Sequence, residues 1–186
     1  MALCDYLIDS NITGYDCTKP MVKGADSVGV ILNRKYIQSW SQTNFRATIN
    51  ICGHNNFKLV QGGKMPFNGT QQEMVEGTHQ NTITNTLQLV ILKHDAETAF
   101  ATLDVLVHGE FVVILANKNG TFQVFGLETG LHCTGAVREL YNDDTLAGWL
   151  VTMTEEGATL GNLFVTATVF YHLLNDQLSP CPQPIG

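Results

Sequence analysis

The sequence is poor in charge: Asp, Glu, Lys and Arg make up 15% of its 186 residues, where about 25% is usual. Much of the surface must therefore be threonine, asparagine, glutamine and glycine, a composition that favours contacts with other protein. Residues 1–93 carry eight Lys/Arg and six Asp/Glu, whereas residues 94–186 carry two and eleven. The second half lacks the clustered cations with which proteins grip nucleic acid.

Long apolar runs and paired cysteines are also missing. No stretch approaches the eighteen or so consecutive apolar residues of a membrane span, and the first residues do not show the basic and then apolar pattern of a secretion signal. The five cysteines are odd in number and include no Cys-x-x-Cys pair, so a disulfide framework is not expected. We expect a protein made in a reducing cytoplasm, without a membrane partner.

Catalytic and metal-binding motifs are absent as well. There is no G-x-S-x-G, P-loop or H-E-x-x-H pattern, and no cysteine has a local nucleophile signature. Cysteine and histidine lie close together at two places, Cys52 with His54 and His132 with Cys133. Neither pair has the spacing of a zinc motif. Other ligands that could complete a metal site with them are Cys4, Cys17 and His79. The pairs Asp143–Asp144 and Glu155–Glu156 lie at predicted turns, where solvated acids are ordinary. We therefore predict no enzyme activity, no cofactor and no metal.

The clearest pattern that is present is a single amphipathic helix from Asp95 to His108. Apolar residues recur on one face at helical spacing, Asp95 can cap the start, and Gly109 follows the end. Phe100 and Leu103 lie on the apolar face. We expect both side chains to be buried against a sheet.

Strand patterns surround the helix. Apolar and polar residues alternate as in half-buried strands, and continuously apolar runs indicate strands buried on both faces. The predicted strands are residues 27–37, 45–51, 57–61, 83–91, 111–115, 122–127, 149–154 and 163–171, with a hairpin turn at Asn117–Gly120. The fold class is therefore α+β and mainly β, with a single helix packed on a mostly β body.

The length suits one domain, and we expect residues 1–186 to form one. Residues 1–25 show no sustained period and predict an N-terminal arm. Residues 178–186 are rich in proline and predict an irregular tail.

Residues 62–80 predict a long loop, because they contain four glycines, a proline and many amides and too little periodicity for a buried element. Loops of more than about 12–15 residues are uncommon in compact domains and are often functional. We predict an interaction arm with an apolar anchor and amides that bond to a neighbouring subunit. The candidate interface residues are Lys64, Met65, Pro66, Phe67, Gln71 and Gln72. The alternatives are a loop covered by its own sheet and a mobile surface loop.

Three stretches together resemble a known class of structural protein: residues 22–32 (VKGADSVGVIL), the strand–helix–strand–hairpin unit of residues 81–128, and residues 126–158 (GLETGLHCTGAVRELYNDDTLAGWLVTMTEEGA). With them the chain resembles virion proteins of the tail-tube-like and neck-ring type, especially those of crAss-like phages of gut Bacteroidetes. The resemblance covers nearly the whole chain, but it consists of the order of elements and not of signature residues. The proline-rich tail and the apolar strand at residues 163–171 depart from the pattern.

The resemblance implies a β-sandwich or barrel of tail-tube type with a single flanking helix and a long loop. It also implies a homo-oligomeric ring of six or twelve copies in the tail or neck of a virion, as tail tube, tail terminator or ring protein. It implies contacts with other tail, neck or portal proteins, and DNA that only passes through the lumen, where an acidic lining would repel phosphates. It implies no catalytic residues and a virion location after synthesis in the bacterial host cytoplasm.

Two other classes of function are compatible with the pattern. The first is a monomeric β-barrel that binds a small ligand in its mouth, which would require an apolar internal cavity. The second is a cysteine hydrolase, whose activity would be lost when its thiol is alkylated. Neither accounts for the glycine-rich residues 62–80.

Overall fold

The computed structural model describes residues 25–44, 46–51, 57–61, 67, 69–91, 96–138, 148–159, 161 and 163–174. Strands predominate in these residues, so the prediction of a mainly β, α+β fold is confirmed. The strands are β1 (Ala25–Asn33), β2 (Ile37–Thr43), β3 (Arg46–Ile51), β4 (Phe57–Gln61), β5 (Gln71–Val75), β6 (Thr82–Ile91), β7 (Glu110–Asn117), β8 (Phe122–Phe125), β9 (Leu131–Arg138), β10 (Trp149–Ala158) and β11 (Leu163–Val165). The helices are α1 (Ala96–His108) and α2 (Ala167–Leu174), and a 3-10 turn, η1 (Arg34–Tyr36), follows β1.

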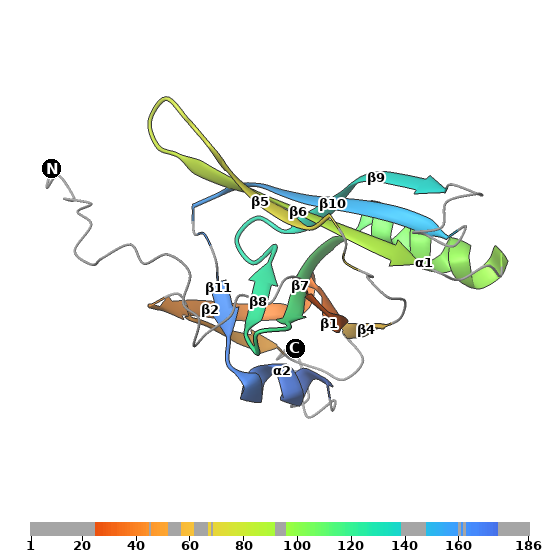
Figure 1. Cartoon of the computed structure of the whole chain (residues 1–186), viewed down its shortest axis with the longest axis horizontal. Helices are drawn as coiled ribbons and strands as arrows, with labels where there is room; N and C mark the ends of the chain where they lie inside the picture. Colours follow the sequence, from red (N-terminus) through yellow and green to blue (C-terminus); the bar gives the residue numbers. More distant parts are fainter. Residues whose placement is uncertain are drawn as a thin grey trace, which may run out of the picture.

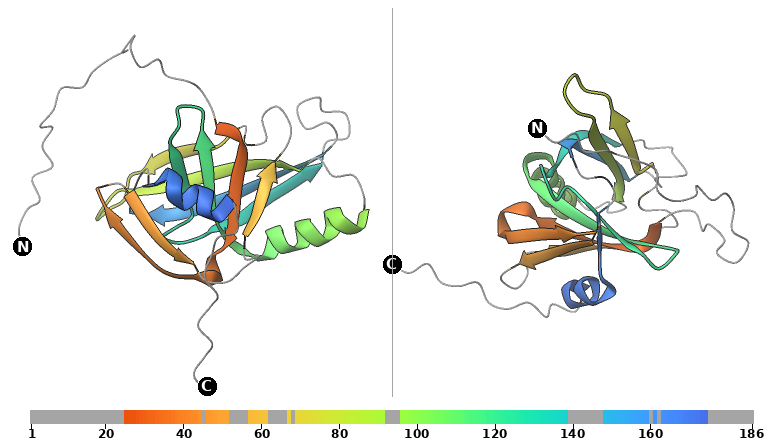
Figure 2. Two further views of the ribbon diagram at one scale, coloured as in Figure 1. Left: turned by 90° about the horizontal axis from the view of Figure 1, so that it is seen from below. Right: turned by 90° about the vertical axis from the view of Figure 1, so that its left-hand side faces the viewer.

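These strands form one hydrogen-bonded sheet that folds over into two layers (Figure 1). The upper layer has the order β5-β6-β10-β9, and the lower layer has the order β2-β3-β11-β8-β7-β1-β4. Neighbouring strands are antiparallel except β3 and β11, which are parallel over the single pair Arg46 and Phe164. Helix α2 lies beneath the lower layer, on the side away from the upper layer, and α1 lies at one end of the body (Figure 2).

The chain passes from the lower to the upper layer between β8 and β9. β7 pairs with β8 through Val113–Ala116 and with β9 only through Glu110 and Phe111. β8 and β9 therefore pair with different parts of the same edge of β7. We call the connecting residues, Gly126–Gly130, the corner segment. Strands of packed sheets commonly switch layers at such irregular bends.

Two apolar clusters lie on opposite faces of the lower layer, and β7 contributes to both. Val112 and Ile114 enter the cluster between the lower layer and α2, while Val113 and Leu115 enter the cluster between the two layers. Phe111 to Ala116 are all buried, because successive side chains of a strand point to opposite faces. The continuously apolar run is therefore buried on both faces of the lower layer.

Helix α1 packs on the layers through the face that its spacing predicts. Leu103 and Leu106 are buried in the cluster between the layers. Phe100 lies in the helix, but its side chain is outside the part that the structure describes.

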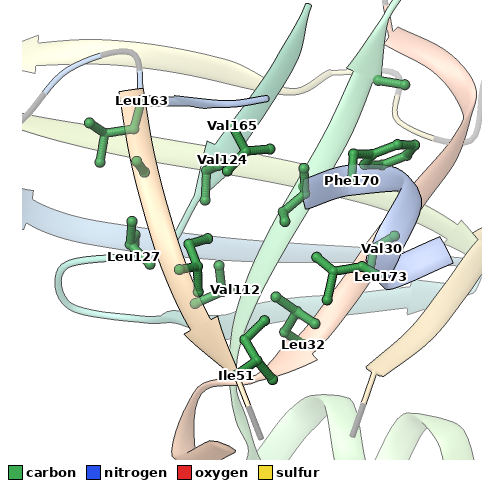
Figure 3. Packing of buried hydrophobic residues seen from close by; sticks show 14 residues of the cluster. Val30, Leu32, Ile51, Val112, Val124, Leu127, Leu163, Val165, Phe170 and Leu173 are labelled. Atoms are coloured by element: carbon green, nitrogen blue, oxygen red, sulfur yellow. The ribbon is translucent and has the colours of Figure 1, made fainter. Parts of the chain in front are cut away.

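The prediction of a single helix is wrong, because the structure contains a second helix, α2. The expected strand at residues 163–171 stops at Val165 and continues as the helix Ala167–Leu174. Thr166 begins the helix: its Oγ1 accepts a hydrogen bond from the N–H of Val169 at 3.4 Å, which is the position of an N-cap. Phe170 and Leu173, three residues apart, point into the cluster beneath the lower layer (Figure 3).

Candidate interaction edge

Strand β5 forms one edge of the upper layer, and among the described strands it pairs only with β6. Its large apolar side chains are exposed: Met74 is 68% and Val75 is 43% accessible. The hairpin that joins β5 to β6 extends beyond the rest of the body (Figure 1). A strand edge with unpaired backbone groups and apolar side chains is a template for pairing with another chain.

Strand β9 forms the opposite edge of the same layer. β7 pairs with it only at Leu131 and His132, and no other described strand lies along Cys133–Val137 on that side. Val137 is exposed. Helix α1 packs beside β9, but among the described residues neither β5 nor this part of β9 has a second strand partner.

The predicted interface residues fall in three places. Gln71 and Gln72 lie on β5, the open edge. Phe67 is 6% exposed and belongs to the cluster between the layers, so its own chain covers it and it is not an exposed anchor. Lys64, Met65 and Pro66 lie outside the described residues.

The prediction of one continuous loop over residues 62–80 is wrong from Gln71 to Val75, which form β5. This strand was missed because it is an edge strand with no buried face: its burial pattern shows one half-buried and four exposed residues. Without a buried face there is no apolar alternation to detect.

A row of polar side chains crosses the upper layer from the β5 edge. Gln72, Asn85 and Glu155 are in register on β5, β6 and β10. The Gln72 Nε2 donates to Asn85 Oδ1 at 2.6 Å, and Asn85 Nδ2 donates to Glu155 Oε2 at 2.7 Å. Asn85 is 4% and Glu155 is 2% exposed. We call this row the polar ladder.

The inner end of the polar ladder holds the corner segment. Glu155 Oε2 accepts from the N–H of Gly126 at 2.7 Å, and Oε1 accepts from the N–H groups of Glu128 and Thr129, each at 3.2 Å. Successive backbone N–H groups of this kind form an anion-binding nest. Here the carboxylate that fills the nest comes from the chain itself.

The outer side of the corner segment is also held by side chains. The Glu128 carboxylate accepts hydrogen bonds from the N–H and the hydroxyl of Thr159. Arg34 donates from Nη2 to the Glu128 carbonyl oxygen at 2.6 Å, and its Nη1 lies 3.7 Å from a Glu110 carboxylate oxygen. The corner segment is therefore fixed from the interior and from the surface.

The prediction that Glu155 is a solvated acid at a turn is wrong, because β10 continues through it to Ala158. Glu156, the next residue, is exposed. Asp143 and Asp144 lie outside the described residues. The sequence signal that was available is the alternation of β10, which turns Val151, Met153 and Glu155 to one face.

The cysteine and histidine candidates do not assemble a site in the described part of the chain. His132 and His79 are exposed, and Cys133 donates from its Sγ to the Gly135 carbonyl oxygen at 3.5 Å. Within these residues, no three His, Cys, Asp or Glu side chains are grouped so that they could hold a metal ion. Cys4, Cys17, Cys52 and His54 lie outside them.

No helix in the described ranges is long and apolar enough to cross a membrane. A scan of the chain against protein-family models, and searches among curated proteins and solved structures, found no match. What the chain does is therefore inferred from its fold and from its strand edges.

Proposed function

We propose that this chain is a structural protein of a bacteriophage virion that forms a homo-oligomeric ring in the tail or neck, around the DNA passage, and that it has no catalytic role. The observation that carries the proposal is the upper layer, in which β5 on one side and Cys133–Val137 of β9 on the other have no second strand partner among the described residues. A contact between two different edges of identical chains is heterologous, and such contacts generate closed rings when the rotation between copies closes.

The two edges are suited to each other. If β5 of one copy lies beside β9 of the next, the sheets become continuous, and the pairing would satisfy the backbone groups at both edges. The same contact would cover exposed Met74 on one side and exposed Val137 on the other. Other tail, neck or portal proteins would then contact the ring along its axis.

The outer face of the upper layer is suited to a DNA passage. Because Leu87, Leu89, Val151 and Met153 are buried, the alternation of the strands places their neighbours on the outer face. Most of the residues on this face are polar or acidic, and the apolar exceptions include Val90 and Leu150. The polar and acidic residues include Glu73, Thr84, Thr86, Gln88, Thr152 and Glu156. A lining with hydroxyls, amides and carboxylates would repel phosphates and let DNA slide.

A small-ligand barrel is less well supported. The space between the layers is occupied by a cluster of apolar side chains, and the cavity beside Glu155 holds only about 10 Å³, roughly the room for one water molecule. Ligand pockets are typically about 300–1,000 Å³. Two larger depressions, of about 570 and 460 Å³, lie around Asn44 and Arg46 and open to the surface.

Light scattering and negative-stain electron microscopy of the full chain at tens of micromolar test the proposal. We expect closed rings of uniform size. Met74→Lys, which places a charge on the β5 edge, should leave the chain folded but prevent ring formation, because lysine on an edge strand opposes pairing. Val105→Lys is the matched control, since Val105 is also exposed but lies on α1.

Rings that form equally well from wild-type chain and from Met74→Lys would show that β5 is not the contact edge. A wild-type chain that stays monomeric, and that is also missing from purified particles, would contradict the virion function.

A further inference from the structure

The carboxylate of Glu155 fixes the direction of every hydrogen bond in the polar ladder. An ionised carboxylate only accepts, so Asn85 must turn its Nδ2 toward Glu155 and its Oδ1 toward Gln72. Gln72 must then donate from Nε2. Gln72 is half-buried on the edge strand, so the outer end of the ladder lies at the edge.

The same carboxylate connects the two edges of the upper layer. At one end, the ladder begins at Gln72 on β5. At the other end, Glu155 holds the N–H groups of Gly126, Glu128 and Thr129, two to five residues before β9 begins at Leu131. Three side chains, Gln72, Asn85 and Glu155, therefore join these parts of the chain by hydrogen bonds.

We propose that the polar ladder is a relay between the two edges, in which Gln72 acts as a positioning residue for the corner segment that leads into β9. This inference rests on the proposed function, because the relay joins two subunit contacts only if the chain forms the proposed ring. A strand paired with β5 would stabilise the hydrogen bond from Gln72 to Asn85. Asn85 would then keep its hydrogen bond to Glu155, and Glu155 would keep its hydrogen bonds from the corner segment.

The relay requires that the side chain of Gln72 can change its hydrogen-bond partner while those of Asn85 and Glu155 stay in place. Gln72 is half-buried on an edge strand, so its amide can exchange Asn85 for water. Asn85 and Glu155 are buried, and a buried polar atom that loses its partner is separated from bulk solvent. When Gln72 turns away, Asn85 Oδ1 is therefore left without its donor, and the hydrogen bond from Asn85 to Glu155 is weakened.

Hydrogen exchange on single chains tests the relay without any need for assembly. In the Met74→Lys background, which keeps copies apart, Gln72→Met removes the donor but retains a side chain of similar length. We expect the backbone amides of Gly126, Glu128 and Thr129 to exchange about fivefold faster, the factor that corresponds to one neutral hydrogen bond.

Gln71→Met is the matched control, because Gln71 is on the same strand but exposed. It should leave exchange in the corner segment unchanged. Unchanged exchange in Gln72→Met, or the same increase in both variants, would overturn the relay.

A second comparison uses assembled rings. Ring formation should slow exchange in the corner segment more in the wild-type chain than in Gln72→Met rings, and equal slowing in both would overturn the relay. If no rings form and the chain is also missing from purified particles, the proposed function fails, whereas the single-chain comparison still decides whether the relay exists.

Discussion

Glu155 lies among apolar side chains because the alternation of β10 turns it inward with Val151 and Met153. Its charge is compatible with burial because four N–H donors converge on its two oxygens, and buried charges need such partners. The sequence does not reveal this role, because Glu155-Glu156-Gly157 has the composition of a turn. The donors of the corner segment lie 26 to 29 residues away along the chain.

Replacement of Glu155 by glutamine should be strongly destabilising. The substitution keeps the shape but replaces one accepting oxygen by an NH₂ group, which would face backbone N–H donors. We expect a loss of about 2–3 kcal/mol in the free energy of unfolding, measured by urea unfolding with tryptophan fluorescence. Glu156→Gln, the exposed neighbour, should change it by less than about 0.5 kcal/mol. Equal effects of the two variants would show that Glu155 does not hold the corner.

Two glycines with the same backbone conformation should respond differently to alanine. Gly126 and Gly120 have φ of 82° and 81°, which costs an L-residue roughly 1–2 kcal/mol. A Cβ at Gly126 would lie 2.6 Å from the Phe111 carbonyl oxygen, whereas a Cβ at Gly120 would meet nothing within 4 Å. Gly126→Ala should therefore cost about 1–3 kcal/mol more than Gly120→Ala in urea unfolding. The same loss for both variants would show that a Cβ at position 126 does not clash with the Phe111 carbonyl oxygen.

Among the elements, α1 could be predicted from the sequence and α2 could not. The α1 pattern has apolar residues on one face only, a capping residue and a terminal glycine. Residues 163–171 are apolar at both even and odd positions, so they fit a strand buried on both faces as well as a buried helix. Tertiary packing selects the helix over the strand, because a helix at this place covers the apolar outer face of the lower layer. Thr166, as N-cap, stabilises the start of the helix.

Truncation of Phe170 tests the packing of α2. Phe170 is 3% exposed, and its ring centroid lies 4.6 Å from that of Phe122. Phe170→Ala should lower the free energy of unfolding by about 3–5 kcal/mol. His172→Ala, on the exposed side of the same helix, should leave the melting temperature nearly unchanged in differential scanning fluorimetry. Wild-type melting of Phe170→Ala would show that α2 does not cover the lower layer.

For the whole molecule, the sequence predicts the class of fold but not the arrangement of its strands. Strands β4, β6, β7 and β8 could be located from alternation, apolar runs and turn residues, because those signals are local. The order β5-β6-β10-β9 depends on pairs that are far apart in the sequence, such as Trp149 with Ile91, and no local pattern encodes them. The candidate edge was found only in part: Gln71 and Gln72 were predicted as contact residues, but the strand that carries them was not.

The central claim is that the neighbour of β5 is the β9 edge of a second copy. A photo-reactive phenylalanine analogue at position 74 tests it, in a mixture of isotopically labelled and unlabelled full-length chains, with position 105 on α1 as the control. We expect cross-links from position 74 to residues 133–137 that join a labelled chain to an unlabelled one, and no cross-links between chains from position 105 to those residues. Cross-links from position 74 only within one chain, or to another surface of the second copy, would contradict it.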